Sequence, residues 1–399
     1  MRICLTLPFE DDSRSASFAL PYGMAVIASI LRSKHPGAEI FFSNDEKMIL
    51  QADEIYCSGL SESWDIVNML AEKVVTHGKR FIVGGQHVTA LPQTLKFGEI
   101  FSGPLEVIDK KWPNPLPDWS IFSEDQKNNA QYVVMTSRGC PFKCKFCSSS
   151  SFWRGYFPLP VDRVIQEITQ VAALNAKEIV LFDDLFTADK RRLRQISERI
   201  VAEGLNSINY SCLIRADSCC PETLELLQKM NVKAMAFGAE SGSDFILTAM
   251  NKKTSRHANQ TCIDMLLDFG FTPVCSVIIG FPGESRKTLS ESLLFIEKNI
   301  ASTLIEVYPV QPLPGTWLWD YFVEQFAPDL NNFDWKSLKI RGNTIDFETY
   351  RVLSNNCSAH ELKQFLNIYE WLLKQHHNIR TTFDRVKNVT NILKYKYFA

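Results

Sequence analysis

The sequence predicts an α/β protein with a Rossmann-like N-terminal domain, a partial (βα)6 TIM-type barrel and a helical C-terminal region. Strand-like and helix-like segments alternate over residues 1–104, and the alternation resumes over residues 131–320. A proline-rich linker, residues 105–130, separates the two. Residues 321–399 then carry a helical pattern. We therefore expect two parallel sheets, whose ligands bind beyond the carboxyl ends of the strands.

In the N-terminal domain, short apolar runs indicate strands at residues 2–8, 39–43, 54–58 and 80–83. Helices are expected at residues 19–31 and 64–75. In the second of these helices, the apolar residues that share one face are Ile66, Met69, Leu70 and Val74. The last strand and helix of this domain, after residues 99–103, look shortened, because the chain soon enters the proline-rich linker.

The barrel strands are expected at residues 132–136, 178–182, 209–214, 234–238, 274–280 and 304–310. The clearest helix between them has an apolar stripe formed by Val161, Val164, Ile165, Ile168, Val171 and Ala172. Six βα repeats indicate an open barrel rather than a complete one of eight. A further amphipathic stripe in the C-terminal region consists of Leu362, Phe365, Leu366, Tyr369, Leu372 and Leu373. It predicts a helix that packs on the barrel or covers the substrate entrance.

Composition and charge narrow the possible partners. Hydrophobic residues make up 45% of the 399-residue chain and charged residues 22%, as in ordinary globular proteins. The net charge of −2 provides no field to attract nucleic acid or an anionic membrane. No apolar run approaches the ~20 residues that span a bilayer, and the N-terminal run is too short for a signal peptide. We expect a cytoplasmic protein that acts on neither membranes nor nucleic acid.

Three of the eleven cysteines, Cys140, Cys144 and Cys147, stand together in the loop after the first barrel strand. Their spacing is C-x3-C-x2-C. A cuboidal 4Fe-4S cluster takes four ligands, so three thiolates would leave one iron open to chelate an amino and a carboxylate group. Zinc is the alternative, but a structural zinc site needs four ligands, and no fourth Cys or His lies nearby in the sequence. We interpret most of the other cysteines as small buried apolar residues.

The triad, its position and the aromatic Phe146 before Cys147 resemble the radical S-adenosylmethionine (SAM) superfamily. The resemblance implies that Cys140, Cys144 and Cys147 hold a catalytic 4Fe-4S cluster, which binds SAM at its open iron. Reductive cleavage of SAM would then yield a 5′-deoxyadenosyl radical that abstracts hydrogen from the substrate. It also implies an electron donor such as flavodoxin or ferredoxin. A small biosynthetic intermediate or a peptide is the expected substrate.

Residues at the later strand ends extend the resemblance to SAM contacts. The expected contacts are Phe146, Asp183, Arg215, Glu240, Ser241, Gly280, Glu284 and Pro314. Structural alternatives remain open at this point. Asp183 could cap the following helix, Arg215 could pair with Asp217 or Glu240, and the glycine and proline positions could simply form turns.

Motifs in the N-terminal domain resemble those of radical SAM enzymes with a cobalamin-binding domain. They are Pro21-Tyr22-Gly23, Ser58-Gly59-Leu60 and Gly84-Gly85-Gln86-His87. The resemblance implies cobalamin held above the cluster, with Ser58, Gly84, Gly85 and His87 as contacts, and a methyltransferase that acts on an unactivated carbon. His87 could instead be a hydrogen-bonded loop residue.

Two other functions stay open. The shortened last βα unit favours a vestigial N-terminal domain and a cobalamin-independent radical reaction, namely dehydrogenation, elimination, rearrangement or ring closure. The D-x-H-x-x-G motif of one class of cobalamin proteins is absent, as it usually is in the subgroup that the chain resembles. The third alternative is a non-catalytic iron–sulfur or zinc protein.

Overall fold

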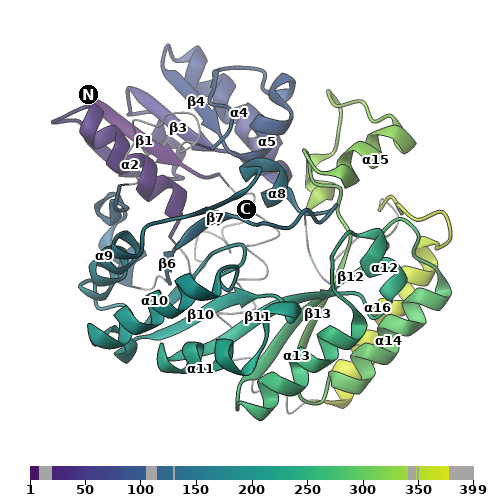
Figure 1. Cartoon of the computed structure of the whole chain (residues 1–399). Coiled ribbons are helices and arrows are strands. Elements are labelled where there is room, and N and C mark those ends of the chain that lie inside the picture. The colour runs from purple at the N-terminus through teal and green to yellow at the C-terminus, as the bar shows by residue number, and fades with distance from the viewer. Residues whose placement is uncertain (9–19, 105–114, 129–130, 340–346, 348–349, 377–399) are drawn as a thin grey trace.

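The computed structural model describes residues 1–8, 20–104, 115–128, 131–339, 347 and 350–376. Two separate parallel sheets form its framework (Figure 1), with strand orders β2-β1-β3-β4-β5 and β13-β12-β11-β10-β9-β6. The predicted fold class, a Rossmann-like unit followed by a partial barrel, is confirmed.

The N-terminal sheet consists of five parallel strands. They are β1 (Arg2–Thr6), β2 (Glu39–Phe42), β3 (Glu54–Ser58), β4 (Arg80–Gly84) and β5 (Glu99–Ile100). Its helices and 3-10 turns are α2 (Tyr22–Lys34), α3 (Glu46–Ile49), η1 (Ser61–Ser63), α4 (Trp64–Thr76), α5 (Gln86–Ala90) and η2 (Pro92–Thr94). The strand order reverses between β1 and β3, the point at which doubly wound sheets bind ligands. The last strand is short as expected, since β5 has only 2 residues. The expected shortening of the last helix falls partly on residues 105–114, which lie outside the described residues.

The second sheet has six parallel strands that neighbour one another in chain order, as the sequence predicts. They are β6 (Tyr132–Val134), β9 (Glu178–Leu181), β10 (Asn209–Ile214), β11 (Val232–Glu240), β12 (Thr272–Ile279) and β13 (Leu304–Pro309). The helices of this unit are α9 (Val161–Ala172), α10 (Lys190–Ala202), α11 (Pro221–Lys229), α12 (Asp244–Ala249), α13 (Arg256–Asp268) and α14 (Arg286–Asn299), with η4 at Leu205–Ser207 and η5 at Ala216–Ser218. In Figure 1, α10, α11, α13 and α14 line the outer side of this sheet.

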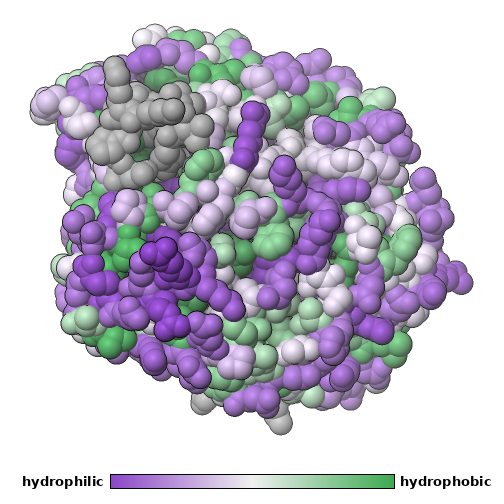
Figure 2. Space-filling model, viewed as in Figure 1, coloured by the Kyte–Doolittle hydropathy of each residue, from purple (hydrophilic) through white to green (hydrophobic). Residues whose placement is uncertain are grey.

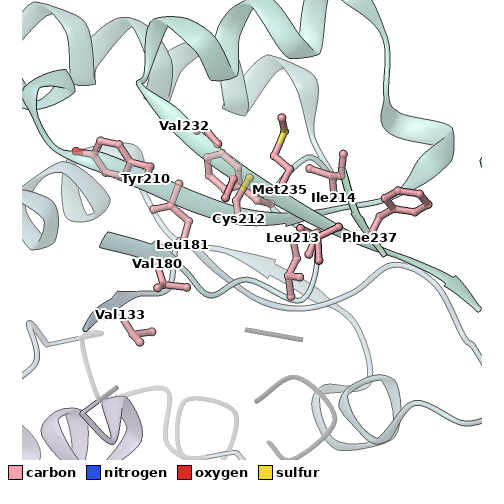
Figure 3. Packing of buried hydrophobic residues seen from close by; sticks show 14 of the residues in the cluster. Val133, Val180, Leu181, Tyr210, Cys212, Leu213, Ile214, Val232, Met235 and Phe237 are labelled. Carbon is pink, nitrogen blue, oxygen red and sulfur yellow. The ribbon is translucent and has the colours of Figure 1, made fainter. Parts of the chain in front are cut away.

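Buried aliphatic side chains fill both faces of the barrel sheet, as is usual for parallel strands. Val180 and Leu213 point to one side of the sheet and Met235 to the other (Figure 3). All three are at most 2% exposed. The short β-branched and aliphatic runs that predict these strands are therefore explained by burial on two sides.

An antiparallel hairpin, which the sequence analysis missed, interrupts the barrel after β6. Its strands are β7 (Ser137–Gly139) and β8 (Tyr156–Pro158), and α8 (Ser148–Trp153) lies between them. Strands of 3 residues are too short to show a periodic pattern. The cysteine triad lies within this hairpin, so the hairpin carries the candidate site.

The C-terminal region wraps back over both units. It contains α15 (Trp317–Phe326), η6 (Trp335–Leu338) and α16 (Ala359–Gln375). The Tyr369 hydroxyl donates to the Ile305 carbonyl at 2.6 Å, so α16 packs on the barrel, one of the two roles the stripe predicts. At the other end, Trp335 packs edge-on against His87 of the N-terminal unit.

The linker is also part of the core. It contains η3 (Trp119–Ile121) and α7 (Glu124–Asn128). Trp119 packs against Tyr22 of α2 and Tyr132 of β6, and it is 3% exposed. The linker thus joins the two sheets through apolar contacts.

The surface is that of an ordinary globular protein. On the face drawn in Figure 2, hydrophilic residues predominate and hydrophobic ones are scattered among them. None of the helices in the described ranges combines the length and hydrophobicity that crossing a bilayer requires.

Candidate cofactor site

Cys140, Cys144 and Cys147 lie in the loop between β7 and α8, where they are half-buried and not joined in a disulfide. Cys147 is the N-cap residue of α8, and its amide donates to the Cys144 carbonyl at 3.2 Å. Cys144 and Cys147 pack against an apolar cluster that includes Phe146. The loop therefore has an apolar wall on one side and accessible sulfur atoms.

The shape of this cysteine loop is fixed by hydrogen bonds to two distant segments. The Lys145 amide donates to the Met250 carbonyl at 3.0 Å, and the Lys145 carbonyl accepts from the Leu318 amide at 3.1 Å. The Asn251 side chain donates to the Lys143 carbonyl at 2.7 Å. The loop is thus held by the segment after α12 and by the start of α15, which favours a preorganised site.

The donor chemistry distinguishes a cluster from a single metal ion. Across the described residues, no three His, Cys, Asp or Glu side chains converge closely enough to hold one ion. A closed structural zinc site with four ligands therefore has no counterpart there. A cuboidal cluster is bound differently, because each thiolate ligates a separate iron atom. Three half-buried thiols on one short loop fit that requirement.

A strained glutamate stands beside the loop. Glu240, at the end of β11, has a φ of 61°, a backbone conformation that is uncommon for a residue with a side chain. It lies at a register shift of the strand pair that follows Gly238. Its carboxylate pairs with the Lys252 ammonium at 2.7 Å, and both side chains are buried. A Cβ at Gly238 would lie 1.9 Å from that carboxylate, so the pair requires glycine there.

Lys252 places a positive charge next to the triad, and the sequence analysis missed it. Its Nζ lies 5.9 Å from the centre of the Phe146 ring. Burial lowers the pKa of Lys252, but the negative charges of Glu240 and of Cys144 outweigh burial, so the pKa is raised. The ammonium therefore stays charged and can offset the charge of a thiolate-bound cluster. The signal in the sequence was the buried Glu240, which needs a cationic partner.

Arg215 holds the loop from the β10 side. Its guanidinium pairs with Asp217 at 2.9 Å, the structural alternative considered above, and donates to the Lys252 carbonyl at 2.6 Å. It also lies over the Phe142 ring, 3.6 Å from the centroid. Arg215 thus links three elements around the triad.

Asp183 lies at the base of the hairpin rather than open to a ligand. Its carboxylate accepts hydrogen bonds from the amides and hydroxyls of both Thr136 and Ser137, at distances from 2.5 to 3.2 Å. Burial raises the pKa of Asp183 against the effect of these bonds. Arg192 also donates to Thr136. These bonds fix the turn between β6 and β7, whereas the expected contact of Asp183 with SAM stays a prediction.

Ser241 and Glu284 are buried at the ends of β11 and β12. The Ser241 hydroxyl bonds to the Ser292 hydroxyl at 3.1 Å. Burial raises the pKa of Glu284 to about 7, while Thr288 donates to its carboxylate. Among the described residues, the Glu284 Oε2 atom has no hydrogen-bond partner although Glu284 is 1% exposed. Glu284 therefore offers a buried, partly protonated group beside the strand ends.

Turns at Gly280 and Pro314 bring backbone to the same edge. Gly280 has a φ of 85°, and a Cβ there would lie 3.1 Å from Leu362 of α16. Pro314 precedes Gly315, where a Cβ would lie 3.0 Å from the Ala90 side chain of α5. The second turn therefore approaches the N-terminal unit closely.

Ser58, Gly84 and Gly85 meet at the carboxyl ends of β3 and β4. Ser58 and Gly84 are register partners, and the Gly59 amide donates to the Gly84 carbonyl at 3.3 Å. Gly85 has a φ of 107°, and a Cβ there would lie 3.2 Å from the Ser58 hydroxyl. The two strand ends thus form a floor of backbone with few side chains, which we call the glycine floor. Such a floor lets a flat ligand approach closely.

His87 lies in α5, directly after this floor in the chain, and is buried. Its Nδ1 bonds to Ser61 at 2.9 Å and its Nε2 to Thr94 at 3.1 Å, and its ring packs against Trp64. Burial lowers the pKa of His87 to about 3, so the ring is neutral. Both ring nitrogens of His87 are thus engaged within the protein and 1% of the residue is exposed, although it lies in α5 rather than in a loop. Its expected contact with cobalamin stays a prediction.

Sequence comparison assigns the barrel to a family. The pattern of the radical SAM superfamily matches residues 134–296, which include the triad and the ends of β9, β10, β11 and β12. Residues 134–296 are a radical SAM domain. A catalytic 4Fe-4S cluster and SAM are the cofactors that this domain implies.

Two relatives illustrate the range of this superfamily. An uncharacterised methyltransferase of Pyrococcus horikoshii is 26% identical over 389 residues, covering 81% of this chain and 83% of the relative. An anaerobic magnesium-protoporphyrin IX monomethyl ester cyclase of Rubrivivax gelatinosus is 24% identical over 224 residues, covering 53% of this chain and 40% of the cyclase.

Two solved structures share the fold across both units. The radical SAM methyltransferase TsrM of Kitasatospora setae, determined with cobalamin and a [4Fe-4S] cluster bound, aligns with a TM-score of 0.68 at 15% identity, covering 81% of this chain and 78% of TsrM. The cobalamin-dependent radical SAM enzyme OxsB, determined with aqua-cobalamin and SAM, aligns with a TM-score of 0.63 at 16% identity, covering 92% of this chain and 61% of OxsB.

Proposed function

We propose that this radical SAM enzyme is a cobalamin-dependent methyltransferase that acts on an unactivated carbon of a small biosynthetic intermediate or a peptide. One observation carries the proposal. The loop that bears the triad packs in the same apolar cluster as Val83 and Val88, which flank the glycine floor. A corrinoid over the floor would therefore lie near the triad. The likeness to TsrM and OxsB, both solved with cobalamin, supports it.

In this proposal the residues of the chain bind, orient and shield the cofactors. Cys140, Cys144 and Cys147 ligate iron and leave one position open. When bound, the cluster and SAM supply one-electron cleavage, and cobalamin supplies a methyl carrier. Lys252 balances negative charge beside Cys144, and Arg215 holds the loop in place. The apolar cluster keeps water away from reactive species. Electrons would come from a donor such as flavodoxin or ferredoxin.

Anaerobic reconstitution with iron, sulfide and hydroxocobalamin tests the proposal. We expect both iron and corrinoid absorbance to survive desalting. The Ser58→Leu variant should lose corrinoid and keep iron, because a bulky side chain would fill the glycine floor. The matched control is Thr76→Leu, at an exposed site at the end of α4, which should keep both. Wild-type protein that retains iron but no corrinoid would refute the cobalamin part of the proposal.

The ligand role of the triad is tested separately. Changing Cys144 to alanine should abolish iron retention and reductive cleavage of SAM. The far-ultraviolet circular dichroism spectrum should stay the same, since the thiol is half-buried. A variant that still cleaves SAM at the wild-type rate would contradict the ligand assignment.

A cobalamin-independent radical reaction is the second candidate, favoured by the 2-residue strand β5 that ends the N-terminal sheet. The two candidates differ in their products. Methyl transfer yields S-adenosylhomocysteine beside 5′-deoxyadenosine, whereas dehydrogenation, elimination, rearrangement or ring closure yields 5′-deoxyadenosine alone. Product analysis with substrate therefore separates them.

A further inference from the structure

Three cysteines outside the cofactor site gather where η5 meets α13. Cys219 and Cys220 directly follow η5, and Cys262 lies in α13, which contacts η5. The cofactor chemistry uses none of them. All three are free thiols, and Cys219 and Cys220 are half-buried whereas Cys262 is buried.

Cys219 and Cys262 are in direct contact. The Cys219 thiol donates to the Cys262 carbonyl oxygen, with 4.0 Å between sulfur and oxygen. A hydrogen bond between the Cys219 and Cys262 side chains lowers the pKa of Cys219. The half-buried thiol of the pair thus has a lowered pKa, and its sulfur lies against the residue that carries the buried thiol. This is the arrangement that thiol–disulfide exchange requires.

Cys220 is a thiol of similar exposure with different neighbours. Its sulfur lies 3.2 Å from the Lys190 ammonium and 3.2 Å from the Thr223 hydroxyl. Burial raises the pKa of Cys220, but these hydrogen bonds outweigh burial and the pKa is lowered. It is also the N-cap residue of α11. Cys220 therefore serves as an internal comparison for Cys219, because the pKa of both thiols is lowered. The sulfur of Cys220, however, faces a lysine rather than a second cysteine.

We propose that Cys219 and Cys262 form a reversible dithiol–disulfide site that reacts with small-molecule disulfides. The Cys219 thiolate attacks one sulfur of the small disulfide, forming a mixed disulfide and expelling one thiolate. Cys262 then loses its proton and attacks the Cys219 sulfur, so that the second thiolate leaves and takes up a proton. Counted from the two thiols, the protein loses two electrons and two protons. The first thiolate takes up the proton that Cys219 released and the second takes up that of Cys262, so the small disulfide becomes two thiols.

The link would join two elements beside the cofactor site. Ser218, next to Cys219, has a hydroxyl that accepts from the Arg215 amide at 3.2 Å. The Arg215 side chain in turn lies over Phe142 of the cysteine loop. Joining Cys219 to Cys262 would fasten the segment that carries Arg215 to α13. The oxidation state of the dithiol would thereby set how firmly this side of the cysteine loop is held.

The test is an anaerobic titration of the reconstituted protein with mixtures of reduced and oxidised glutathione. After acid quench and alkylation, peptide mass spectrometry maps the links. We expect a Cys219–Cys262 link that reverses on adding reduced glutathione, and a mixed glutathione disulfide at Cys220. The Cys219–Cys262 link should form at a lower proportion of oxidised glutathione, because the second thiol is already in contact.

Variants make the result specific. Cys219→Ser and Cys262→Ala should lose the link entirely, and Cys220→Ser should form it as the wild type does. If the wild type never shows the link while Cys220 becomes modified, the proposal fails. It also fails if the link forms only once the protein is unfolded in urea. These measurements detect the oxidation state of the cysteines, so their outcome does not depend on whether the protein binds cobalamin.

Discussion

At the scale of single residues, the site contains charged side chains that are buried and paired with each other. Glu240 and Lys252 are 2% and 8% exposed and pair with each other. Isolated ions at such depth would be strongly destabilising. After pairing, the electrostatic energy of each side chain still depends on the charges around it. For Lys252 these include Cys144, whose negative charge raises the pKa of the ammonium. Lys252 is therefore a positioning and electrostatic residue for the cluster.

The first prediction concerns Lys252. Replacing it with methionine should lower the reduction potential of the cluster, because the reduced, more negative state loses a nearby positive charge. Potentiometric titration followed by electron paramagnetic resonance measures this change. Lys252→Arg should keep the potential near that of the wild type. Lys253→Met, which removes an exposed and screened charge, is the matched control. Equal potentials in Lys252→Met and the control would contradict the assigned role.

The second prediction concerns Glu284. Burial raises its pKa from 4.5 to about 7, so the folded state holds this proton over a pH range in which the unfolded state has lost it. The contribution of Glu284 to the free energy of unfolding is therefore fully present below pH 4.5. It is lost as the pH rises towards 7 and beyond, because the carboxylate must ionise while buried. The loss amounts to about 3 kcal/mol.

Glu284→Gln removes this penalty while keeping an oxygen that accepts from Thr288. We expect the variant to gain stability over the wild type at pH 8 and to show little gain at pH 5. Urea unfolding at both pH values measures the difference. A gain that is the same at both would show that Glu284 does not titrate in this range.

At the scale of elements, the end of β11 is shaped around one pair of side chains. The register shift after Gly238 and the positive φ of Glu240 turn its carboxylate towards Lys252. Such irregularities recur next to active sites, where they redirect a side chain. The irregular strand pairing at the end of β11 thus positions the Glu240 carboxylate.

The third prediction tests that arrangement. A methyl group at Gly238 would lie 1.9 Å from the Glu240 carboxylate and 2.8 Å from the Lys252 ammonium. Gly238→Ala should therefore cost about 1–3 kcal/mol in overpacking and displace the ion pair. Gly23→Ala, in α2 with no atom within 4 Å of the added carbon, should be neutral or stabilising. Chemical denaturation compares the two, and equal stabilities would argue against a fixed ion pair.

At the scale of the whole molecule, the C-terminal region holds the two units together. Trp335 of η6 is 3% exposed and packs against His87 on one side and Trp319 of α15 on the other. His87 of α5 is thereby shielded from water. The glycine floor and the cysteine loop are kept in one relative position by these contacts.

The fourth prediction removes this contact. Trp335→Ala should cost about 3–5 kcal/mol and open the N-terminal unit to limited proteolysis. Trp371→Ala changes a tryptophan of α16 that is 57% exposed, so it should leave both stability and digestion unchanged. If the two variants are cut at the same rate, the C-terminal region does not fasten the units as described.

The sequence was sufficient for features that depend on local pattern. The strands of both sheets and the helical stripe of α9 follow from runs of apolar residues, and Cys140, Cys144 and Cys147 follow from spacing. The partners of Glu240 and Asp183 could not be found this way, because pairing in three dimensions joins residues 12 and 47 positions apart. The burial of His87 could not be predicted for a similar reason, since Trp335, which packs against it, follows the barrel in sequence.

The position of Trp119 bears on how this chain could be divided for study. Because its ring lies between Tyr22 and Tyr132, a fragment cut on either side of it would present bare aromatic surface to water. A barrel expressed alone would be prone to aggregate, and an isolated N-terminal fragment would lose part of its interior. The two halves are therefore mutual folding partners, and exchanging one for the half of a relative would require the linker to travel with it.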